Sequence, residues 1–210
     1  MIPTSLPPIL TPVYWVRHGE NTANLSRRFS YRVFDGDLTD RGVAQAQELT
    51  RALRVNGRHY GLLVCSPLRR AQQTARIVSA GLGLPIEAEL EDLREVNVGD
   101  LDGRNDEAAW DVYGAVLERW RSGHLETRFP GGESGDELAA RMERALQTVA
   151  GRAGSSGAVI IAHGANIRAA IPTLTGQPDP GIDLATGGIA RFTVAAGPRS
   201  GSRVTLEAWT

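Results

Sequence analysis

Residues 13–20 read Val13-Tyr14-Trp15-Val16-Arg17-His18-Gly19-Glu20. This apolar, strand-forming run ends in a cation, an imidazole and a glycine, a pattern typical of a buried strand that carries functional groups at its carboxyl end. Gly19 is expected to supply a tight turn. Residues 158–162 form a second buried-strand run, which stops in the same way at His163-Gly164. Two strands that each end in His-Gly predict that His18 and His163 meet at one sheet edge.

A third apolar run, residues 61–65, leads into a helix with two arginines at its start. Ser66 is expected to cap this helix and Pro67 to occupy its first position. Arg69 and Arg70 then fall in the opening turn, where free backbone N–H groups and the helix dipole favour an anion. Successive helix positions are about 100° apart, so only one of the two arginines can point squarely into a site.

The composition favours one α/β domain with small-molecule partners. The chain has 210 residues, of which 41% are hydrophobic and 22% charged, with a formal net charge of -1. No basic face or polybasic run stands out, which argues against a nucleic-acid or membrane-surface role. All 23 basic residues are arginine. The lack of lysine excludes a Walker-type phosphate loop and a Schiff-base lysine, whereas guanidinium groups suit bidentate phosphate binding.

The N-terminal segment and the single cysteine suggest a cytoplasmic protein. Residues 1–11 are proline-rich and precede any basic residue, unlike a signal peptide, so we expect a loose arm followed by a single domain over residues 12–210. No apolar run approaches the roughly 20 residues that a membrane span requires. Cys65 has no partner for an internal disulfide and is expected to be a small core residue.

Local signals predict the remaining elements. Thr39 is expected to cap one helix, Asn105 or Asp106 a second, and Ser134 with Glu137 forms the capping box of a third. A further helix starts at residue 165 and is expected to be disrupted by Pro172. Residues 85–88 favour an edge strand, and residues 188–195 and 203–209 alternate like antiparallel strands.

Through four separated motifs, the sequence resembles members of the histidine phosphatase superfamily, also described as phosphoglycerate mutase-like. They are Arg17-His18-Gly19-Glu20 with Asn24; Ser66-Pro67-Leu68-Arg69-Arg70-Ala71-Gln72-Gln73-Thr74-Ala75; Leu93-Arg94-Glu95 with Gly99 and Gly103; and Ala162-His163-Gly164. Each is weak alone, but their order and spacing make a strong signal. The resemblance implies a three-layer α/β/α sandwich around a mostly parallel mixed sheet, with residues 104–133 as a helical insertion over the active site.

The resemblance also implies the site residues. His18 would be the nucleophile that forms a phosphohistidine, and Glu95 the general acid of the branch that uses glutamate. Arg70 is selected over Arg69, because the family arginine directly precedes alanine; Arg69 is expected to form a surface ion pair. The other implied residues are Arg17 and His163 in catalysis, and Asn24, Ser30 and Gly164, together with Arg17, Arg70 and His163, in substrate binding.

Physical chemistry sets requirements for these roles. His18 must be neutral to attack, which neighbouring guanidinium groups would favour, while a hydrogen bond from its other ring nitrogen to a backbone carbonyl would fix its tautomer. Glu95 should be partly shielded from water. A zinc or iron site is the other interpretation of paired histidines, but neither has a second ligand at motif spacing and the arginines would repel a cation. We therefore expect no metal and no cofactor.

The leading hypothesis is a phosphomonoesterase for a small phosphorylated metabolite. A phosphoglycerate mutase is the nearest alternative, less favoured because the chain lacks the long carboxyl-terminal segment associated with mutases. A non-catalytic phosphate-binding member of the fold is the third. Ser30-Tyr31, Val98 and Leu101 depart from the family pattern, so the pocket rim and the substrate stay open. A homodimer is the candidate oligomeric state.

Overall fold

The fold is built on a mixed six-stranded sheet in the order β3-β2-β4-β1-β5-β6. The structure, a computed structural model, describes residues 9–179, 181, 183–196 and 203–209. The strands are β1 (Ile9–Arg17), β2 (Tyr60–Cys65), β3 (Ile86–Glu89), β4 (Gly157–Ala162), β5 (Ile189–Ala196) and β6 (Arg203–Trp209). Strands β1 to β4 run parallel, and β5 and β6 are antiparallel to their neighbours. The expected mostly parallel mixed sheet is confirmed.

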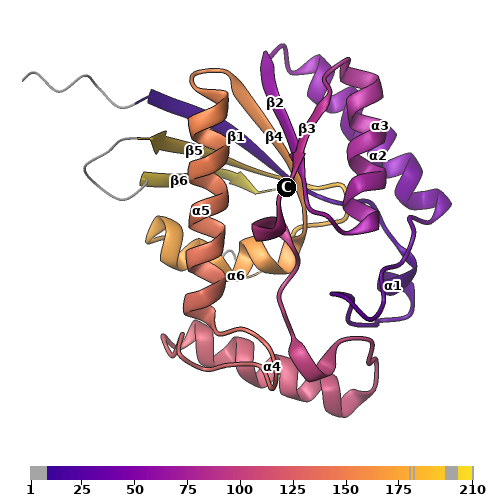
Figure 1. Ribbon diagram of the computed structural model, residues 1–210, viewed down its shortest axis with the longest axis vertical. Coiled ribbons are helices and arrows are strands. Elements are labelled where there is room, and N and C mark those ends of the chain that lie inside the picture. Colours follow the sequence, from indigo (N-terminus) through magenta and orange to yellow (C-terminus); the bar gives the residue numbers. More distant parts are fainter. Residues whose placement is uncertain (1–8, 180, 182, 197–202, 210) are drawn as a thin grey trace, which may run out of the picture.

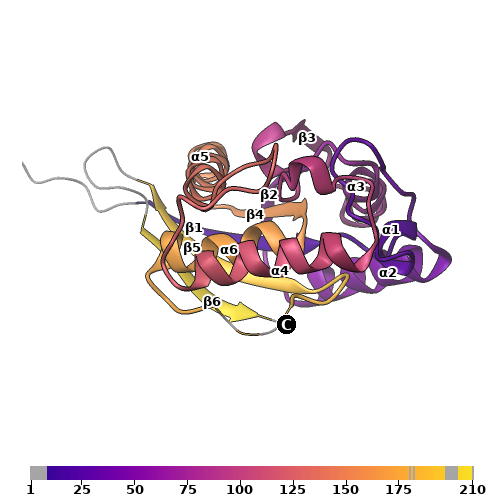
Figure 2. The same ribbon diagram turned by 90° about the horizontal axis from the view of Figure 1, so that it is seen from below.

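Helices cover both faces of the sheet. They are α1 (Thr22–Leu25), α2 (Asp40–Val55), α3 (Arg69–Leu82), α4 (Glu107–Arg121), α5 (Gly135–Ala153) and α6 (Gly164–Thr175), with short 3-10 turns at Glu91–Leu93 and Gly99–Leu101. Helices α2 and α3 lie on one side and α5 and α6 on the other, while α4 lies below the sheet (Figure 1). Seen from below, α4 runs across the molecule (Figure 2). Among the helices described, none is long and apolar enough to cross a membrane.

The alternation of β1 explains the layers. Tyr14 and Val16 are buried against α2 and α3, whereas Val13 and Trp15 are buried against the α5 and α6 side. Because successive side chains of a strand point to opposite faces, a run in which all four residues are apolar must be covered on both sides. The three-layer α/β/α architecture is therefore the one that this sequence requires, and the expected fold class is confirmed.

The helix caps follow the local signals. The side chain of Thr39 accepts from the N–H of Gly42, and Asp106 accepts from Ala109. Ser134 and Glu137 form the predicted capping box at the start of α5. Cys65 is fully buried, as expected for a small core residue, and His59 and His124 are exposed. Burial raises the pKa of the Cys65 thiol to about 12, so the thiol stays protonated.

The amino-terminal segment differs from the expected loose arm over residues 1–11. Ile9 to Thr11 belong to β1 and pair with β5, from Ile9 opposite Ala196 onward, while residues 1–8 lie outside the described residues. Proline has no N–H to donate to a strand ladder, so it is tolerated where its nitrogen faces no partner strand. In the structure the pairing with β4 starts only at Val13, so Pro12 has a partner strand on one side alone.

Helix α3 begins later than predicted, at Arg69 rather than Pro67, with Leu68 as its N-cap residue. The Ser66 hydroxyl is engaged elsewhere, within 2.8 Å of Nε2 of His163. The N–H of Arg69 instead donates to the carboxylate of Asp35 at 2.9 Å. The cap is therefore supplied by a distant loop, which local sequence signals do not reveal.

Pro172 does not disrupt α6, contrary to the expectation. The helix runs on to Thr175 and ends at Gly176, which has the left-handed φ of 69° typical of a C-cap. A proline removes one backbone donor from a helix. Ile167 and Ile171 are fully buried and anchor to the core the two turns of α6 that precede Pro172.

Candidate active site

The two histidines meet at the carboxyl ends of β1 and β4. These strands are parallel neighbours, with Arg17 opposite Ala162, so the next residues of both chains leave the sheet side by side. The N–H of His18 donates to the carbonyl of Ala162 at 3.0 Å. The ring centroids of His18 and His163 are 5.2 Å apart at an interplanar angle of 66°. The sheet thus brings both imidazoles to one place.

His18 is buried and held in one tautomer. Its Nδ1 lies 2.7 Å from the carbonyl oxygen of Gly19, and its Nε2 lies 3.0 Å from Nε of Arg70. A carbonyl can only accept and a guanidinium can only donate, so Nδ1 carries the proton and Nε2 carries the lone pair. Burial, then the charges of Arg70 and Arg17, lower the pKa of His18 well below its usual value. The ring is neutral and Nε2 is its basic atom.

Arg70 occupies the second position of α3 and is only 3% exposed. Besides the bond to His18, its Nη1 donates to the hydroxyl of Ser30 at 2.9 Å and its Nη2 to the Ser30 carbonyl at 3.0 Å. Asp35 lies 3.4 Å from Nη1. Burial lowers the pKa of Arg70 to about 10, which leaves it a cation at neutral pH. Arg69 instead forms an exposed ion pair with Asp37, as predicted.

Arg17 crosses the first turn of α6. Its Nη1 donates to the carbonyl of Leu184 at 2.6 Å. A Cβ added to Gly164 would lie 2.9 Å from Cδ of Arg17, so a glycine is needed for the guanidinium to lie there. The missing side chain at Gly164 thus leaves room for the side chain of Arg17. The first backbone N–H groups of α6 have no partner within the helix, so they are available as donors beside this guanidinium.

His163 is fully buried beside His18. Its Nε2 lies 2.8 Å from the Ser66 hydroxyl, and its carbonyl accepts from Nε1 of Trp15 at 2.9 Å. Among the residues described, Nδ1 of His163 has no hydrogen-bond partner. Burial and then the charge of Arg70 lower the pKa of His163 well below its usual value. A buried polar nitrogen without a partner is costly, and a bound ligand is one way to satisfy it.

Glu95 is half-buried and is held by backbone N–H groups. Its Oε1 accepts from the backbone N–H groups of Val96 at 3.0 Å and Asn166 at 2.8 Å, the latter at the start of α6. The loop that carries it is held by Arg141, which donates to the Glu95 carbonyl at 3.0 Å and forms a buried ion pair with Glu133 at 2.8 Å. Glu95 is thus partly shielded, as its proposed role requires.

Asn24 lies in the short helix α1. Its Oδ1 accepts from the N–H of Asn21 at 3.1 Å, and the Asn21 side chain accepts from the N–H of Asn24 in return. The amide nitrogen of Asn21 is buried and, in the described part of the chain, without a partner. Asn21 and Asn24 both face the cavity described next.

A cavity of about 440 Å³ joins these groups. Of the predicted residues it is lined by Arg17, His18, Asn24, Ser30, Arg70, Glu95 and Gly164, and His163 lies behind them. Tyr113 and Leu117 of α4, within the segment 104–133, line its other side. Within residues 9–179, 181, 183–196 and 203–209, no three His, Cys, Asp or Glu side chains are grouped as metal ligands.

Four residues that hold the site were missed from the sequence: Ser66, Asp35, Asn166 and Arg141. Ser66 and Asn166 flank strand ends and could have been found as polar residues at the active edge of the sheet. Asp35 and Arg141 act across 35 and 46 or more positions of the chain. Nothing in their local sequence marks them.

In a comparison with known protein families, residues 13–206 match the model of the histidine phosphatase superfamily, branch 1. The chain belongs to this superfamily. The expected phosphoglycerate mutase-like resemblance is thereby confirmed, because the match spans both strand-end histidines, Arg70 and Glu95.

Relatives within the histidine phosphatase superfamily include both mutases and phosphatases. A 2,3-bisphosphoglycerate-dependent phosphoglycerate mutase from Methylobacterium radiotolerans is 35% identical over 91% of this chain and 93% of its own. The solved mycobacterial glucosyl-3-phosphoglycerate phosphatase in complex with VO3 is 26% identical, with a TM-score of 0.76 over 95% of this chain and 98% of that one. The alpha-ribazole phosphatase from Shigella flexneri is 25% identical, with a TM-score of 0.72 over 95% and 96%.

Proposed function

We propose that the chain is a phosphomonoesterase that hydrolyses a small phosphorylated metabolite through a phosphohistidine on His18. The observation that carries this proposal is the state of His18. Its ring is neutral, its Nδ1 proton is fixed by the Gly19 carbonyl, and its Nε2 lone pair lies beside a buried guanidinium in an open cavity. That is the state an imidazole needs to attack phosphorus.

The phosphoryl group is bound by donors from several elements. A phosphate monoester dianion repels nucleophiles, so a catalyst must surround it with positive charge and hold the attacking atom in line. Arg17 and Arg70 supply the charge, and Asn24 and the first turn of α6 at Gly164 add neutral donors. Nδ1 of His163, which is buried and has no partner among the described residues, donates to the same group once phosphate is bound.

In the first half-reaction, Nε2 of His18 attacks phosphorus and the bond from phosphorus to the ester oxygen breaks. The departing oxygen takes a proton from the carboxyl group of Glu95, which leaves the alcohol neutral. The phosphorus-to-nitrogen bond makes the imidazole cationic, and the carbonyl of Gly19 stabilises this charge through the Nδ1 proton. The backbone donors of Val96 and Asn166 hold the Glu95 carboxylate that remains.

In the second half-reaction, Glu95 takes a proton from water, whose oxygen attacks phosphorus. The bond from phosphorus to Nε2 breaks, inorganic phosphate forms and His18 returns to its neutral state. One carboxyl group thus acts first as acid and then as base.

Phosphoglycerate mutase activity is the second candidate, favoured by the 35% identity to the Methylobacterium mutase. The two activities differ in what takes the phosphoryl group from His18. The phosphatases among the similar structures, which cover 95% of the chain, support water as the acceptor.

One assay separates the two candidates. Phosphate release and isomerisation of 3-phosphoglycerate are measured together, with and without a bisphosphate primer. The proposal predicts that hydrolysis of a generic aryl phosphate and of phosphorylated metabolites outpaces primed isomerisation. Faster isomerisation would make the chain a mutase, and no hydrolysis between pH 4 and 8 would make it a non-catalytic phosphate-binding protein.

A further inference from the structure

A second cavity of about 280 Å³ adjoins the catalytic one, between α4 and α6. We call it the chamber. The two cavities share six lining residues: Tyr113, Leu117, Arg121, Ala165, Arg168 and Asp183. Shared walls of this extent make the chamber a continuation of the site, of a size suited to part of a small ligand.

Helix α6 sets the direction from one cavity to the other. Gly164 and Ala165 in its first turn line the catalytic cavity, whereas Ala169 and Pro172 line only the chamber. A helix rises 1.5 Å per residue, so the chamber follows α6 for roughly 10 Å beyond the phosphate site. A phosphate ester bound at the start of α6 can therefore extend its organic part along this helix into the chamber.

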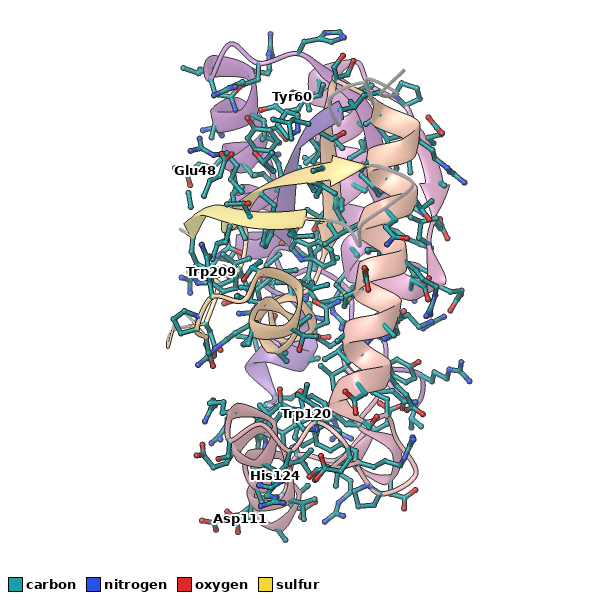
Figure 3. All side chains as sticks on the ribbon, turned by 90° about the vertical axis from the view of Figure 1, so that its left-hand side faces the viewer. Glu48, Tyr60, Asp111, Trp120, His124 and Trp209 are labelled. Carbon is teal, nitrogen blue, oxygen red and sulfur yellow. The ribbon has the colours of Figure 1, made fainter. Side chains whose placement is uncertain are left out.

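The walls of the chamber are mostly apolar. Leu117 and Trp120 of α4, and Leu125 after it, face Ala169 of α6. Trp120 lies on the side of α4 turned toward the rest of the fold, while Asp111 and His124 lie on the far side (Figure 3). Trp120 is 6% exposed, and its indole N–H already donates to the Thr127 carbonyl at 2.7 Å. Its ring thus offers an apolar surface without an unmet donor.

The charges around the chamber neutralise one another. Arg168 pairs with Asp179 at 2.8 Å and with Asp183 at 2.5 Å. Arg121 pairs with Asp179 at 3.2 Å and with Glu118 at 2.7 Å. A carboxylate or second phosphate entering the chamber would have to displace these partners, whereas an uncharged group would not.

We propose that the chamber binds the uncharged, ring-bearing alcohol portion of a phosphomonoester. This inference rests on the proposed function and narrows its substrate class to phosphate esters of alcohols with a bulky apolar or aromatic body. Compact acids such as phosphoglycerates fall outside that class, because the two arginines among the described residues of the chamber, Arg121 and Arg168, are already paired with carboxylates. Tyr113, which lines both cavities, contacts the ester at the junction.

Binding of two non-hydrolysable phosphonates tests the chamber without relying on turnover. Ethylphosphonate reaches only the phosphate site, whereas 2-phenylethylphosphonate carries the same anionic group with a ring that fits the chamber. Calorimetry is expected to show the phenyl compound binding about tenfold tighter or more, because its ring leaves water. Equal affinities, or weaker binding of the phenyl compound, would overturn the proposal.

Variants in which a large side chain fills the chamber test whether the chamber is the source of the affinity difference. Ala169→Phe places a ring inside it, and the ratio of the two affinities is expected to fall to about one. Thr173→Trp fills it from the rim and covers the case in which the first variant does not fold. Ala115→Phe, on the exposed side of α4, is the control and keeps the ratio of the unmodified protein. A preserved ratio in both filled variants would contradict the proposal.

Turnover of ethyl phosphate and 2-phenylethyl phosphate separates this inference from the proposed function. If neither ester is hydrolysed but the phenyl phosphonate binds tighter, the phosphatase assignment fails and the chamber stands. If both are hydrolysed with equal kcat/KM and the phosphonates bind equally, the phosphatase assignment stands and the chamber proposal is wrong.

Discussion

Nε of Arg70 donates to Nε2 of His18 across 3.0 Å, and Nε2 is the atom that would attack phosphorus. The same guanidinium is held by both oxygen atoms of Ser30. Substrate binding must therefore exchange one acceptor of Arg70, the imidazole lone pair, for a phosphoryl oxygen. Burial and then the charge of Arg70 lower the pKa of His18, so the ring is neutral while the hydrogen bond from Arg70 holds it in place.

Replacing this arginine should affect catalysis far more than replacing its neighbour. Arg70→Lys keeps the positive charge but loses the planar guanidinium that donates to His18 and Ser30 at the same time. The kcat/KM is therefore expected to fall by about 10²–10³-fold. Arg69→Lys is the matched control, because Arg69 forms an exposed ion pair with Asp37. Steady-state hydrolysis of an aryl phosphate measures both. Equal losses in the two variants would refute the assignment of Arg70.

The buried histidines should make stability depend on pH. The pKa of His163 is lowered well below its usual 6.5 in the folded chain, so below that pH the unfolded chain binds more protons. Its contribution is fully present above about pH 6.5 and is lost as the pH falls toward the lowered pKa. The free energy of unfolding should lose about 1.4 kcal/mol per pH unit for each such histidine.

His163→Asn tests that slope. Urea unfolding between pH 6.5 and 5 should show a pH slope smaller by about 1.4 kcal/mol per unit than in the unmodified protein. His59→Asn, at an exposed position, removes an imidazole from the surface as the control. An unchanged slope in His163→Asn would mean that this ring is not held neutral.

The ion pair of Arg141 and Glu133 should support both the fold and Glu95. Arg141→Met leaves Glu133 buried and uncompensated and frees the loop carbonyls at residues 92–95, so it should lower the free energy of unfolding by about 3–5 kcal/mol and reduce kcat. Arg144→Met is the control, since its pair with Asp92 is largely exposed and should change stability by less than about 1 kcal/mol. Denaturant unfolding and steady-state kcat are measured for both variants. Equal changes in Arg141→Met and Arg144→Met would contradict the proposed role of Arg141.

The backbone of Gly19 packs so closely against the backbone of Gly42 that there is no room for a side chain at position 19. A Cβ at this position would lie 2.3 Å from the carbonyl oxygen of Gly42, at the start of α2. Gly19→Ala should therefore destabilise the protein by about 1–3 kcal/mol and displace His18, with loss of turnover. Gly151→Ala, within α5 and in open space, should instead stabilise it by up to about 1 kcal/mol. Thermal unfolding of both variants compares the two, and a tolerated Gly19→Ala would contradict the packing argument.

The sequence allowed the active edge to be predicted because it depends on short-range patterns. Each strand ends directly at His18, His163 or the turn before Arg70, and parallel strands bring such ends together. The groups that hold these side chains could not be predicted in the same way. Asp35 caps α3 from a loop, and Ser66 bonds His163 as well as the N–H of Leu68, the N-cap residue of α3. Both depend on tertiary contacts that override local capping preferences.

The extent of β1 shows a similar limit. Pro12 lacks the backbone N–H that a strand residue normally donates. Because β4 starts to pair with β1 only at Val13, Pro12 has a partner strand on the β5 side alone and is tolerated in β1. The chamber could not be found from the sequence either. The spacing of Tyr113, Leu117 and Trp120 predicts an apolar helix face, and only the structure shows that part of this face borders a cavity.

The proposed mechanism requires His18 to carry the phosphoryl group during turnover. The most direct measurement mixes the protein with an aryl phosphate for less than one turnover, quenches in alkali to preserve phosphohistidine, and locates the phosphoryl group by peptide mass spectrometry. We expect one phosphoryl group on the peptide that contains His18 and none in His18→Asn, which still binds vanadate. A phosphoryl group on another residue, or turnover by His18→Asn, would contradict it.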